Sequence, residues 1–214
     1  MQIARDAIKS TTLALRFFSM IDKRPTILTD RLCMRPFYLA DASDVQRLAG
    51  DERISATTLN LPHPYPDGLA ADWILSHEEN LFAQKSLVLA ISLRSNGQLA
   101  GAVGLTLKRE LDNAELGYWI AVKFWNNGYA TEAAFAITTY GFDHLNLHKI
   151  YAHHFADNAA SGRVMQKIGM IHEGFLREHI KHQGHYINLH QFGLLHTDLV
   201  QPPITNIEVH HQVE

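Results

Sequence analysis

The feature that most constrains the fold is a change in sequence period between residues 87 and 137. Residues 87–93 and 99–107 have the composition of β-strands, and Ser95-Asn96-Gly97 between them is a hairpin turn signal. Residues 114–122 form a third strand-like segment. From Tyr129 the period becomes helical, with small or apolar residues at Ala130, Ala133, Ala134 and Ile137. The sequence therefore predicts an antiparallel meander that leads directly into a helix packed against the sheet.

The residues before the meander predict one strand and two helices. Residues 28–36 contain β-forming residues and end at Pro36, so we expect a first strand there. Asp41-Ala42-Ser43-Asp44 is a helix start signal. Three prolines in residues 61–66 remove backbone donors and fix φ, which excludes regular structure. A second helix follows, and its apolar face is formed by Leu69, Trp73, Ile74 and Leu81.

The residues after the meander predict three further strands around a short helix. Strands are expected at 149–155, 170–178 and 186–196, and a helix is expected at 159–168, ended by Gly169. Periodicity is weak after Gln201, which predicts a frayed tail. The order, roughly β-α-α-β-β-β-α-β-α-β-β, predicts an α/β fold in which helices flank a mixed sheet.

Length and composition predict a single domain. Of 214 residues, we expect 25–200 to form the domain, 1–24 an N-terminal extension and 201–214 a C-terminal tail. A net charge of −3 argues against a broad nucleic-acid-binding surface. No run approaches the roughly 18 apolar residues that span a membrane, and residues 1–24 lack the apolar core of a signal peptide. With a single cysteine, Cys33, a cytoplasmic protein is expected.

Histidine is unusually frequent, with 14 residues, and three of them recur at every third position: His179, His182 and His185. This spacing raises the possibility of a metal site. Zinc sites, however, combine ligands from separate elements, and no cysteine or acidic cluster accompanies these histidines. We therefore expect no bound metal and a polar loop and strand surface instead.

The most informative segment is residues 125–133, which read WNNGYATEA. It lies where a strand becomes a helix, and a helix N-terminus offers unpaired N–H groups and a positive dipole end to a phosphate. Small residues at Gly128 and Ala130 let an anion approach the backbone. The chain lacks the lysine-bearing phosphate loop of nucleotide triphosphatases and the Gly-x-Gly-x-x-Gly pattern. By spacing alone, an ordinary tight strand-to-helix turn is the favoured explanation of the segment.

This segment and three other groups of residues make the chain resemble the GNAT superfamily, and within it the RimJ/RimL-like protein N-terminal acetyltransferases. The superfamily loop reads Arg/Gln-x-x-Gly-x-Gly/Ala, and Trp125 stands where Arg or Gln is usual, as is common in this branch. The resemblance covers about residues 28–198. The other matching residues are Thr29-Asp30-Arg31-Leu32 with Arg35-Pro36, the Pro-rich segment 61–66, and 157–161 with 167–170 and Glu173-Gly174.

The resemblance implies a central mixed, mostly antiparallel twisted sheet with a V-shaped opening between two parallel strands. It also implies acetyl-CoA as co-substrate, with the pantetheine arm along the strand from Ile120 to Val122 and the pyrophosphate on the amides of residues 127–131. The implied cofactor-binding residues are Ile120, Val122, Asn127, Gly128, Tyr129, Ala130, Thr131 and Asn158.

Acetyl transfer to an amine requires a neutral nucleophile and a proton for the departing thiolate. Glu115 is the candidate base, and a strand glutamate paired with a neighbouring Arg or Lys is the alternative. An α-amine with pKa about 7.7–8.0 is roughly a tenth neutral at pH 7, whereas a lysine near 10.4 is roughly 0.04% neutral. A modest base therefore suffices for an N-terminal acceptor. Cys33, far in sequence from the loop, is expected to be a small buried residue rather than a nucleophile.

Asn158 and Ser161 complete the expected site. Asn158 is an N-cap for the helix that starts at Ala159, and the resemblance also places its side chain on the pantetheine. The resemblance places the Ser161 hydroxyl near the sulfur, where it can donate to the leaving thiolate. Arg163 and Lys167 are candidates for contact with the nucleotide phosphates, and an exposed helix face is the alternative explanation for both.

Acceptor selection is the least determined part of the prediction. Tyr118 and Trp119 alternate in direction along their strand, so one is expected to face the site and the other the core. Tyr118, His63 and Tyr65 are the candidate substrate-binding residues, although a surface loop is an equal alternative for the last two. The expected acceptor is the N-terminal α-amine of a ribosomal protein. A small amine and a non-catalytic acyl-CoA-binding module are alternatives, and the oligomeric state is left as monomer or homodimer.

Overall fold

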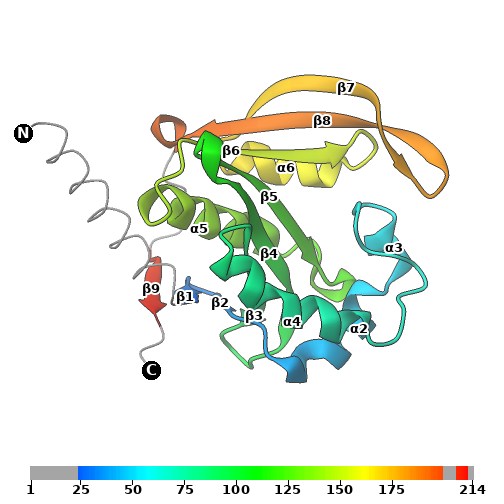
Figure 1. Ribbon diagram of the computed structural model, residues 1–214, viewed down its shortest axis with the longest axis vertical. Helices are drawn as coiled ribbons and strands as arrows, with labels where there is room; N and C mark the ends of the chain where they lie inside the picture. Colours follow the sequence, from blue (N-terminus) through cyan, green and yellow to red (C-terminus); the bar gives the residue numbers. More distant parts are fainter. Residues whose placement is uncertain (1–23, 200–205, 212–214) are drawn as a thin grey trace, which may run out of the picture.

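The computed structural model describes residues 24–199 and 206–211, whose strands form one nine-stranded sheet in the order β7-β8-β6-β5-β4-β3-β2-β1-β9 (Figure 1). Neighbouring strands are antiparallel except β5 and β6, which are parallel. The strands are β1 (Pro25–Leu28), β2 (Leu32–Arg35), β3 (Ser86–Leu93), β4 (Leu99–Lys108), β5 (Asn113–Ile120), β6 (Lys149–Phe155), β7 (Ile171–His182), β8 (His185–Leu195) and β9 (Glu208–His211). The mixed, mostly antiparallel sheet is therefore confirmed.

Helices cover both faces of the sheet (Figure 1). They are α2 (Ala42–Ala49), α3 (Glu52–Ser55), α4 (Leu69–Phe82), α5 (Tyr129–Asp143) and α6 (Ala159–Lys167). Successive residues of β5 alternate between the faces: Leu116 belongs to the apolar cluster of α5 and α6, and Trp119 to that of α2 and α4. Burying apolar side chains on both sides holds the centre of the sheet between two helical layers.

The first strand is not one strand, and in this respect the sequence prediction is wrong. Residues 25–35 form a hairpin, β1 and β2, with Ile27 opposite Met34 and Leu28 opposite Cys33. The turn closes because Thr29 N–H donates to the Leu32 carbonyl oxygen at 2.9 Å and Leu32 N–H donates to Thr29 Oγ1 at 3.2 Å. A local threonine turn, which strand composition does not reveal, divides the segment.

The third strand of the meander is shorter than predicted. β5 ends at Ile120, and Val122 begins a short 3₁₀ turn, η3 (Val122–Phe124), instead of extending the strand. Val122 therefore lies outside the strand on which the resemblance places the pantetheine. The backbone turns here because Phe124 N–H donates to the Ala121 carbonyl oxygen at 2.8 Å.

The expectation of a frayed tail is also wrong for part of the C-terminus. Residues 208–211 form β9 and pair antiparallel with β1, from Pro25 opposite His211 to Leu28 opposite Glu208. Strand pairing gives these four residues backbone partners that no local period predicts. The expected N-terminal extension, apart from Arg24, lies outside the described residues.

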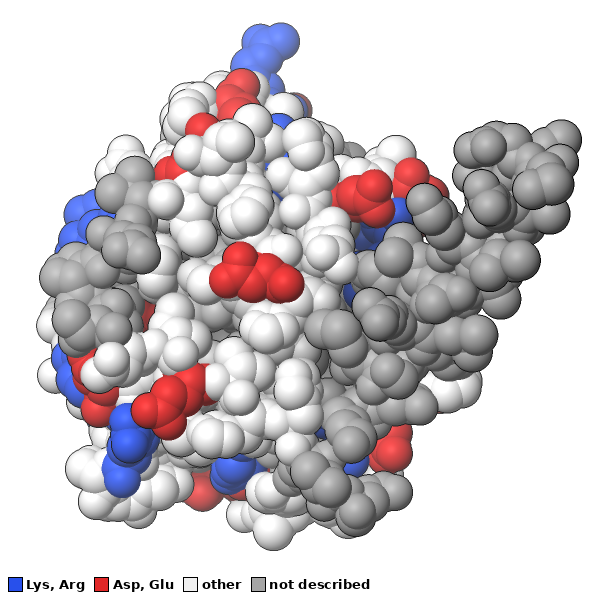
Figure 2. All heavy atoms as spheres, turned by 90° about the vertical axis from the view of Figure 1, so that its left-hand side faces the viewer, with Lys and Arg blue, Asp and Glu red and all other residues white. Residues whose placement is uncertain are grey.

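The remaining elements follow the sequence closely. Helix α5 begins at Tyr129, and Gly169 follows α6 with φ +91°. The Pro-rich segment 61–66 forms neither helix nor strand. No helix within the described ranges combines the length and apolar character of a membrane span. On the described part of the face shown in Figure 2, Lys and Arg side chains lie singly at the margins and form no extended basic surface.

Candidate active site

The glycine-containing loop between η3 and α5, residues 125–131, has the geometry of an anion cradle. We call it the phosphate loop. Gly128 is the N-cap of α5 with φ +79°, and Asn126 has φ +63°. At this cap no side chain accepts a hydrogen bond from the first turn. The free amides and the dipole of a 15-residue helix therefore point out of the loop, as a diphosphate requires.

Side chains of the phosphate loop hold its own backbone. The Trp125 indole N–H donates to the Ile120 carbonyl oxygen at 2.6 Å, which ties the loop to the end of β5. Asn127 Nδ2 donates to the carbonyl oxygens of Phe124 and Trp125 at 3.1 and 3.0 Å. These contacts give Trp125 a structural role that sequence reasoning missed. They also occupy one lone pair of the Ile120 carbonyl, which was expected to bind the pantetheine.

The two parallel strands diverge beside this loop. β5 and β6 pair only at Asn113–Lys149, Ala114–Ile150 and Glu115–Tyr151, after which each strand pairs with its other neighbour alone. Glu115 therefore stands at the last paired position, where the strands separate. This divergence is the arrangement that the resemblance implies for a V-shaped opening.

Glu115 is bonded to a histidine rather than to Arg or Lys. Its Oε1 lies 2.9 Å from His153 Nδ1 on β6, and His153 Nε2 lies 3.4 Å from Gln191 Oε1 on β8. The hydrogen bond with Glu115 raises the pKa of His153. The Glu115 side chain remains 42% exposed, so its second oxygen is open to a substrate or a water. Sequence reasoning missed His153, because the pair forms across two strands that are 38 residues apart.

Ser161 and Tyr118 lie on the opposite face of the sheet from Glu115. The Tyr118 hydroxyl is 2.8 Å from Ser161 Oγ, and it donates to the Ser161 carbonyl oxygen at 3.2 Å. Burial raises the pKa of Tyr118 to about 12, so this phenol stays protonated at neutral pH. Asn158 caps α6 as predicted, since its Oδ1 accepts from Ser161 N–H at 3.2 Å. Trp119, by contrast, is buried in the core beside α2 and α4.

Residues 31–171 match the family model described as Acetyltransferase (GNAT) domain. The chain belongs to the GNAT acetyltransferases. The expected family, fold and enzyme class, an N-acetyltransferase, are therefore confirmed.

Individual relatives of this acetyltransferase agree with that assignment. It is 28% identical to the N-acetyltransferase p20 of Bacillus licheniformis over 172 residues, which cover 79% of this chain and 96% of p20. Its fold matches that of Mycobacterium smegmatis RimJ in complex with CoA-disulfide with a TM-score of 0.69, 21% identity, and coverage of 79% and 84% of the two chains. It also matches spermidine N-acetyltransferase from Vibrio cholerae in complex with CoA and spermine with a TM-score of 0.67, 21% identity, and coverage of 78% and 96%.

The candidate acceptor residues of this acetyltransferase lie at the end of α2. His63 Nδ1 is 3.0 Å from the Gly50 carbonyl oxygen, and Tyr65 Cβ lies 3.1 Å from the position that a side chain on Gly50 would occupy. The Pro-rich segment therefore packs against the end of α2, and Leu61 and Tyr65 contact the apolar cluster that contains Trp119. The role of His63 and Tyr65 in acceptor binding stays a prediction.

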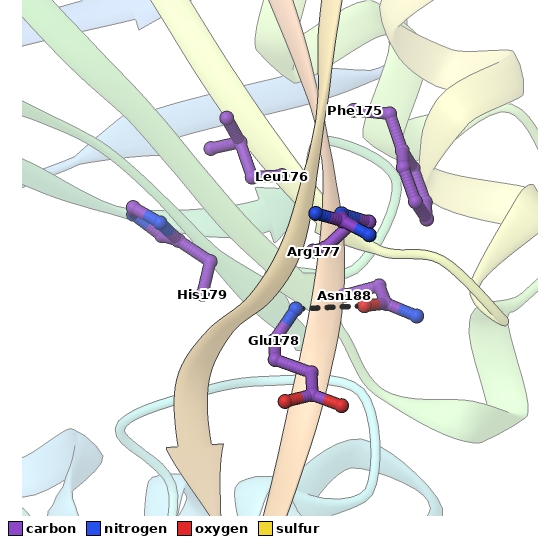
Figure 3. A pocket seen from close by; sticks show the side chains of 6 residues that line it. All are labelled: Phe175, Leu176, Arg177, Glu178, His179 and Asn188. Carbon is purple, nitrogen blue, oxygen red and sulfur yellow. Dashed lines mark hydrogen bonds between the residues drawn. The ribbon is translucent and has the colours of Figure 1, made fainter.

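The β7–β8 hairpin reaches over to this side of the molecule. At its tip, Gln183 Nε2 donates to Ser55 Oγ of α3 at 3.2 Å. The register of β7 shifts between Leu176 and Ile180, and a hollow of about 690 Å³ opens at the irregularity (Figure 3). Glu178 N–H donates to Asn188 Oδ1 at 2.7 Å across it. The hollow is lined by Phe175, Leu176, Arg177, Glu178, His179 and Asn188.

Of the three regularly spaced histidines, His182 and His185 lie opposite each other across the β7–β8 turn. His179 lines this hollow, while the His182 ring packs against Phe155 with 5.1 Å between centroids. Within the described ranges, no group of three or more His, Cys, Asp or Glu residues is arranged to hold a metal ion.

Proposed function

We propose that this acetyltransferase moves the acetyl group of acetyl-CoA to a primary amine by direct attack, and that it belongs to the RimJ/RimL-like branch. The N-terminal α-amine of a protein is the proposed acceptor. The observation that carries the proposal is the preformed phosphate loop beside the diverging strands, with a carboxylate on one side of the divergence and a hydroxyl on the other.

In this proposal the acceptor nitrogen attacks the thioester carbonyl carbon, the C–N bond forms and the C–S bond breaks. The proton lost by the amine passes to Glu115 and His153, whose 2.9 Å hydrogen bond makes them a single acceptor. Ser161 donates a hydrogen bond to the departing thiolate. The Tyr118 hydroxyl, 2.8 Å from Ser161 Oγ, holds the serine hydroxyl in place.

Covalent catalysis by cysteine is not part of the proposal. Cys33, the one cysteine of the chain, is on β2, and the strands β3 and β4 separate it from β5. Burial raises the pKa of its thiol, which disfavours the nucleophilic thiolate. Both observations disfavour a nucleophilic role, although Cys33 is only partly buried and not fully buried as expected.

The acceptor class rests on the resemblance of the phosphate loop and Pro-rich segment to the RimJ/RimL-like branch. Fold similarity alone does not separate protein from small-molecule acceptors, because the RimJ and spermidine acetyltransferase folds match nearly equally well. A small amine is therefore the second candidate acceptor.

The test is thiol release from acetyl-CoA with four acceptors, read together with product mass. The acceptors are a peptide with a free N-terminus, the same peptide N-terminally blocked but containing lysine, spermidine and a free amino acid. Release with the first peptide alone supports the proposed acceptor. Release with spermidine or the amino acid supports the second candidate. Tight binding of CoA with no acceptor-dependent release would show a binding module instead of an enzyme.

A further inference from the structure

A buried carboxylate lies directly beneath the phosphate loop. Glu132, in the first turn of α5, has only 4% of its side chain exposed. Its Oε1 accepts from the Thr29 hydroxyl at 2.6 Å and from Arg31 N–H at 3.0 Å. Its Oε2 accepts from Arg31 Nε at 2.7 Å and lies 2.6 Å from Nη2. The turn between β1 and β2 is thereby fixed to the start of α5, about a hundred residues away in sequence.

Arg31 reaches from this carboxylate to the phosphate loop itself. Its Nη1 donates to the Asn127 carbonyl oxygen at 2.9 Å, and its guanidinium lies over the Tyr129 ring, 4.9 Å from the centroid. The Asn127 carbonyl and the Gly128 N–H belong to one planar trans peptide, so they point in opposite directions. Because Arg31 holds this oxygen, it also limits the direction in which the Gly128 N–H can point.

The turn that carries Thr29 and Arg31 is itself fixed to the rest of the sheet. Arg94, which follows β3, donates through Nη1 to the Thr29 carbonyl oxygen at 2.6 Å and through its backbone N–H to the Arg31 carbonyl oxygen at 2.9 Å. The Thr29 side chain is buried. Arg31 is thus held from both ends, which limits how far its guanidinium can move relative to the loop.

Stability alone does not explain this arrangement. Burying the Glu132 carboxylate costs desolvation energy, and the Arg31 side chain is 51% exposed, so solvent screens part of the attraction between them. What apolar side chains cannot provide is a donor on the Asn127 carbonyl. The benefit that only this ion pair supplies is therefore the orientation of the phosphate loop.

We propose that Thr29, Arg31 and Glu132, here called the loop clamp, are positioning residues that orient the Gly128 amide for the diphosphate of the acyl donor. The inference rests on the proposed use of acetyl-CoA. The loop clamp acts through the backbone, so it favours donors that carry a diphosphate and is indifferent to thioesters that lack one.

The test compares acetyl-CoA with S-acetylpantetheine, which presents the same thioester without the diphosphate. Arg31→Met and Glu132→Gln are expected to raise KM for acetyl-CoA by about tenfold while kcat at saturation stays within twofold. Thr29→Val, which replaces the hydroxyl by a methyl group in a side chain of almost the same shape, is expected to raise KM for acetyl-CoA by about threefold. Thr29→Ser, which keeps the hydroxyl, is expected to have the KM of the wild type. With S-acetylpantetheine, kcat/KM of every variant is expected to match the wild type.

Asp41→Asn is the matched control, because it breaks a partly buried ion pair with Arg35 (2.8 Å) that is remote from the phosphate loop. It is expected to lower the melting temperature without changing KM for either donor. If the loop-clamp variants lost kcat/KM equally with both donors, the positioning role would be overturned. An unchanged KM for acetyl-CoA would overturn it as well. If the wild type itself fails to bind CoA, the proposed function falls together with the loop clamp.

Discussion

The donor end of the molecule, around the phosphate loop, and the hairpin end, where β7 and β8 approach α3, are held in different ways. At the donor end a buried carboxylate accepts hydrogen bonds from both Thr29 and Arg31, and Trp125 and Asn127 fix the loop to itself. At the hairpin end, Gln183 at the tip donates a side-chain hydrogen bond to Ser55 of α3. β7 is largely exposed and irregular in register.

The donor end is therefore preorganised before a ligand binds, whereas the hairpin end is less constrained. Preformed donors lower the entropic cost of binding a diphosphate, since the loop needs little reordering. A hairpin with a bulge and few fixed contacts can adjust to an acceptor. We infer that the donor end determines affinity for the acyl donor and that the hairpin end determines which amine is accepted. The predictions below test that division.

The largest effect is expected from Glu115→Gln. Loss of the proton acceptor is expected to lower kcat by about 10²-fold while the Kd for CoA is unchanged, because the carboxylate lies away from the phosphate loop. Steady-state kinetics and calorimetry measure the two quantities. Glu110→Gln, an exposed carboxylate on the preceding turn, is the control and is expected to match the wild type.

The same substitution tests the pair with His153 through pH. Glu115 raises the pKa of His153, and the pair can take a proton only after that histidine has lost its own. Activity is therefore expected to rise with pH through the raised pKa. In Glu115→Gln the acid limb of the residual activity is expected to move to lower pH, and a limb that stays in place would remove His153 from the mechanism.

The second-largest effect is expected on CoA affinity, when glycine is replaced by valine at each of the two ends. Gly128→Val is expected to weaken CoA binding by about 30-fold, roughly 2 kcal/mol, because a branched side chain stands between the anion and the amides. Gly184→Val, in the β7–β8 turn, is the matched control because both glycines have φ near +80° (+79° and +87°). Both variants carry the same backbone strain. Calorimetry is expected to show the loss of affinity only for Gly128→Val, and equal losses would contradict the placement of the diphosphate.

A smaller effect is expected on acidification, through His77 of α4. Its ring is buried between Phe37 and Trp73, and its nitrogens have no hydrogen-bond partner among the described residues. Burial lowers the pKa of His77 from 6.5 to about 4. Protonation therefore favours the unfolded chain, so this contribution to stability is complete above pH 6.5 and is lost as the pH falls toward 4.

Urea unfolding at pH 7 and pH 5 measures how much His77 contributes to the pH dependence of stability. Between these two pH values the free energy of unfolding of the wild type is expected to fall by about 1 to 2 kcal/mol more than that of His77→Leu. Hydrogen exchange at pH 5 is expected to accelerate in α4 before α5, since α4 carries the titrating group. Equal acid sensitivity of the two proteins would show that His77 is not the group responsible.

The smallest effect is expected at the tip of the hairpin. Gln183→Ala removes one partly buried hydrogen bond to Ser55 and is expected to change the acceptor KM by two- to threefold, with no change in the Kd for CoA. Gln98→Ala, at the exposed turn between β3 and β4, is the control. A change in donor affinity instead of acceptor KM would break the division between the two ends.

Much of the fold was predictable because its signals are local. The strand composition of residues 87–93 and 99–107 and the turn signal at Asn96-Gly97 are each complete within a few residues, and the structure reproduces them as β3 and β4. The start of α5 at Tyr129 follows equally from the change of period. The hairpin in residues 25–35 was missed, since Thr29 closes its turn through a side-chain bond that strand composition does not encode.

The site divides along the same line. Local sequence patterns were enough to predict the turn at Gly128, the Asn158 cap and the strand that carries Glu115, because each depends on residues within one turn or one strand. Only the tertiary structure decided that His153 would be the partner of Glu115, that Arg31 and Glu132 would meet beneath the loop, and that β9 would pair with β1. Those contacts depend on strand order and register, which are set by packing of the whole sheet and not by any local period.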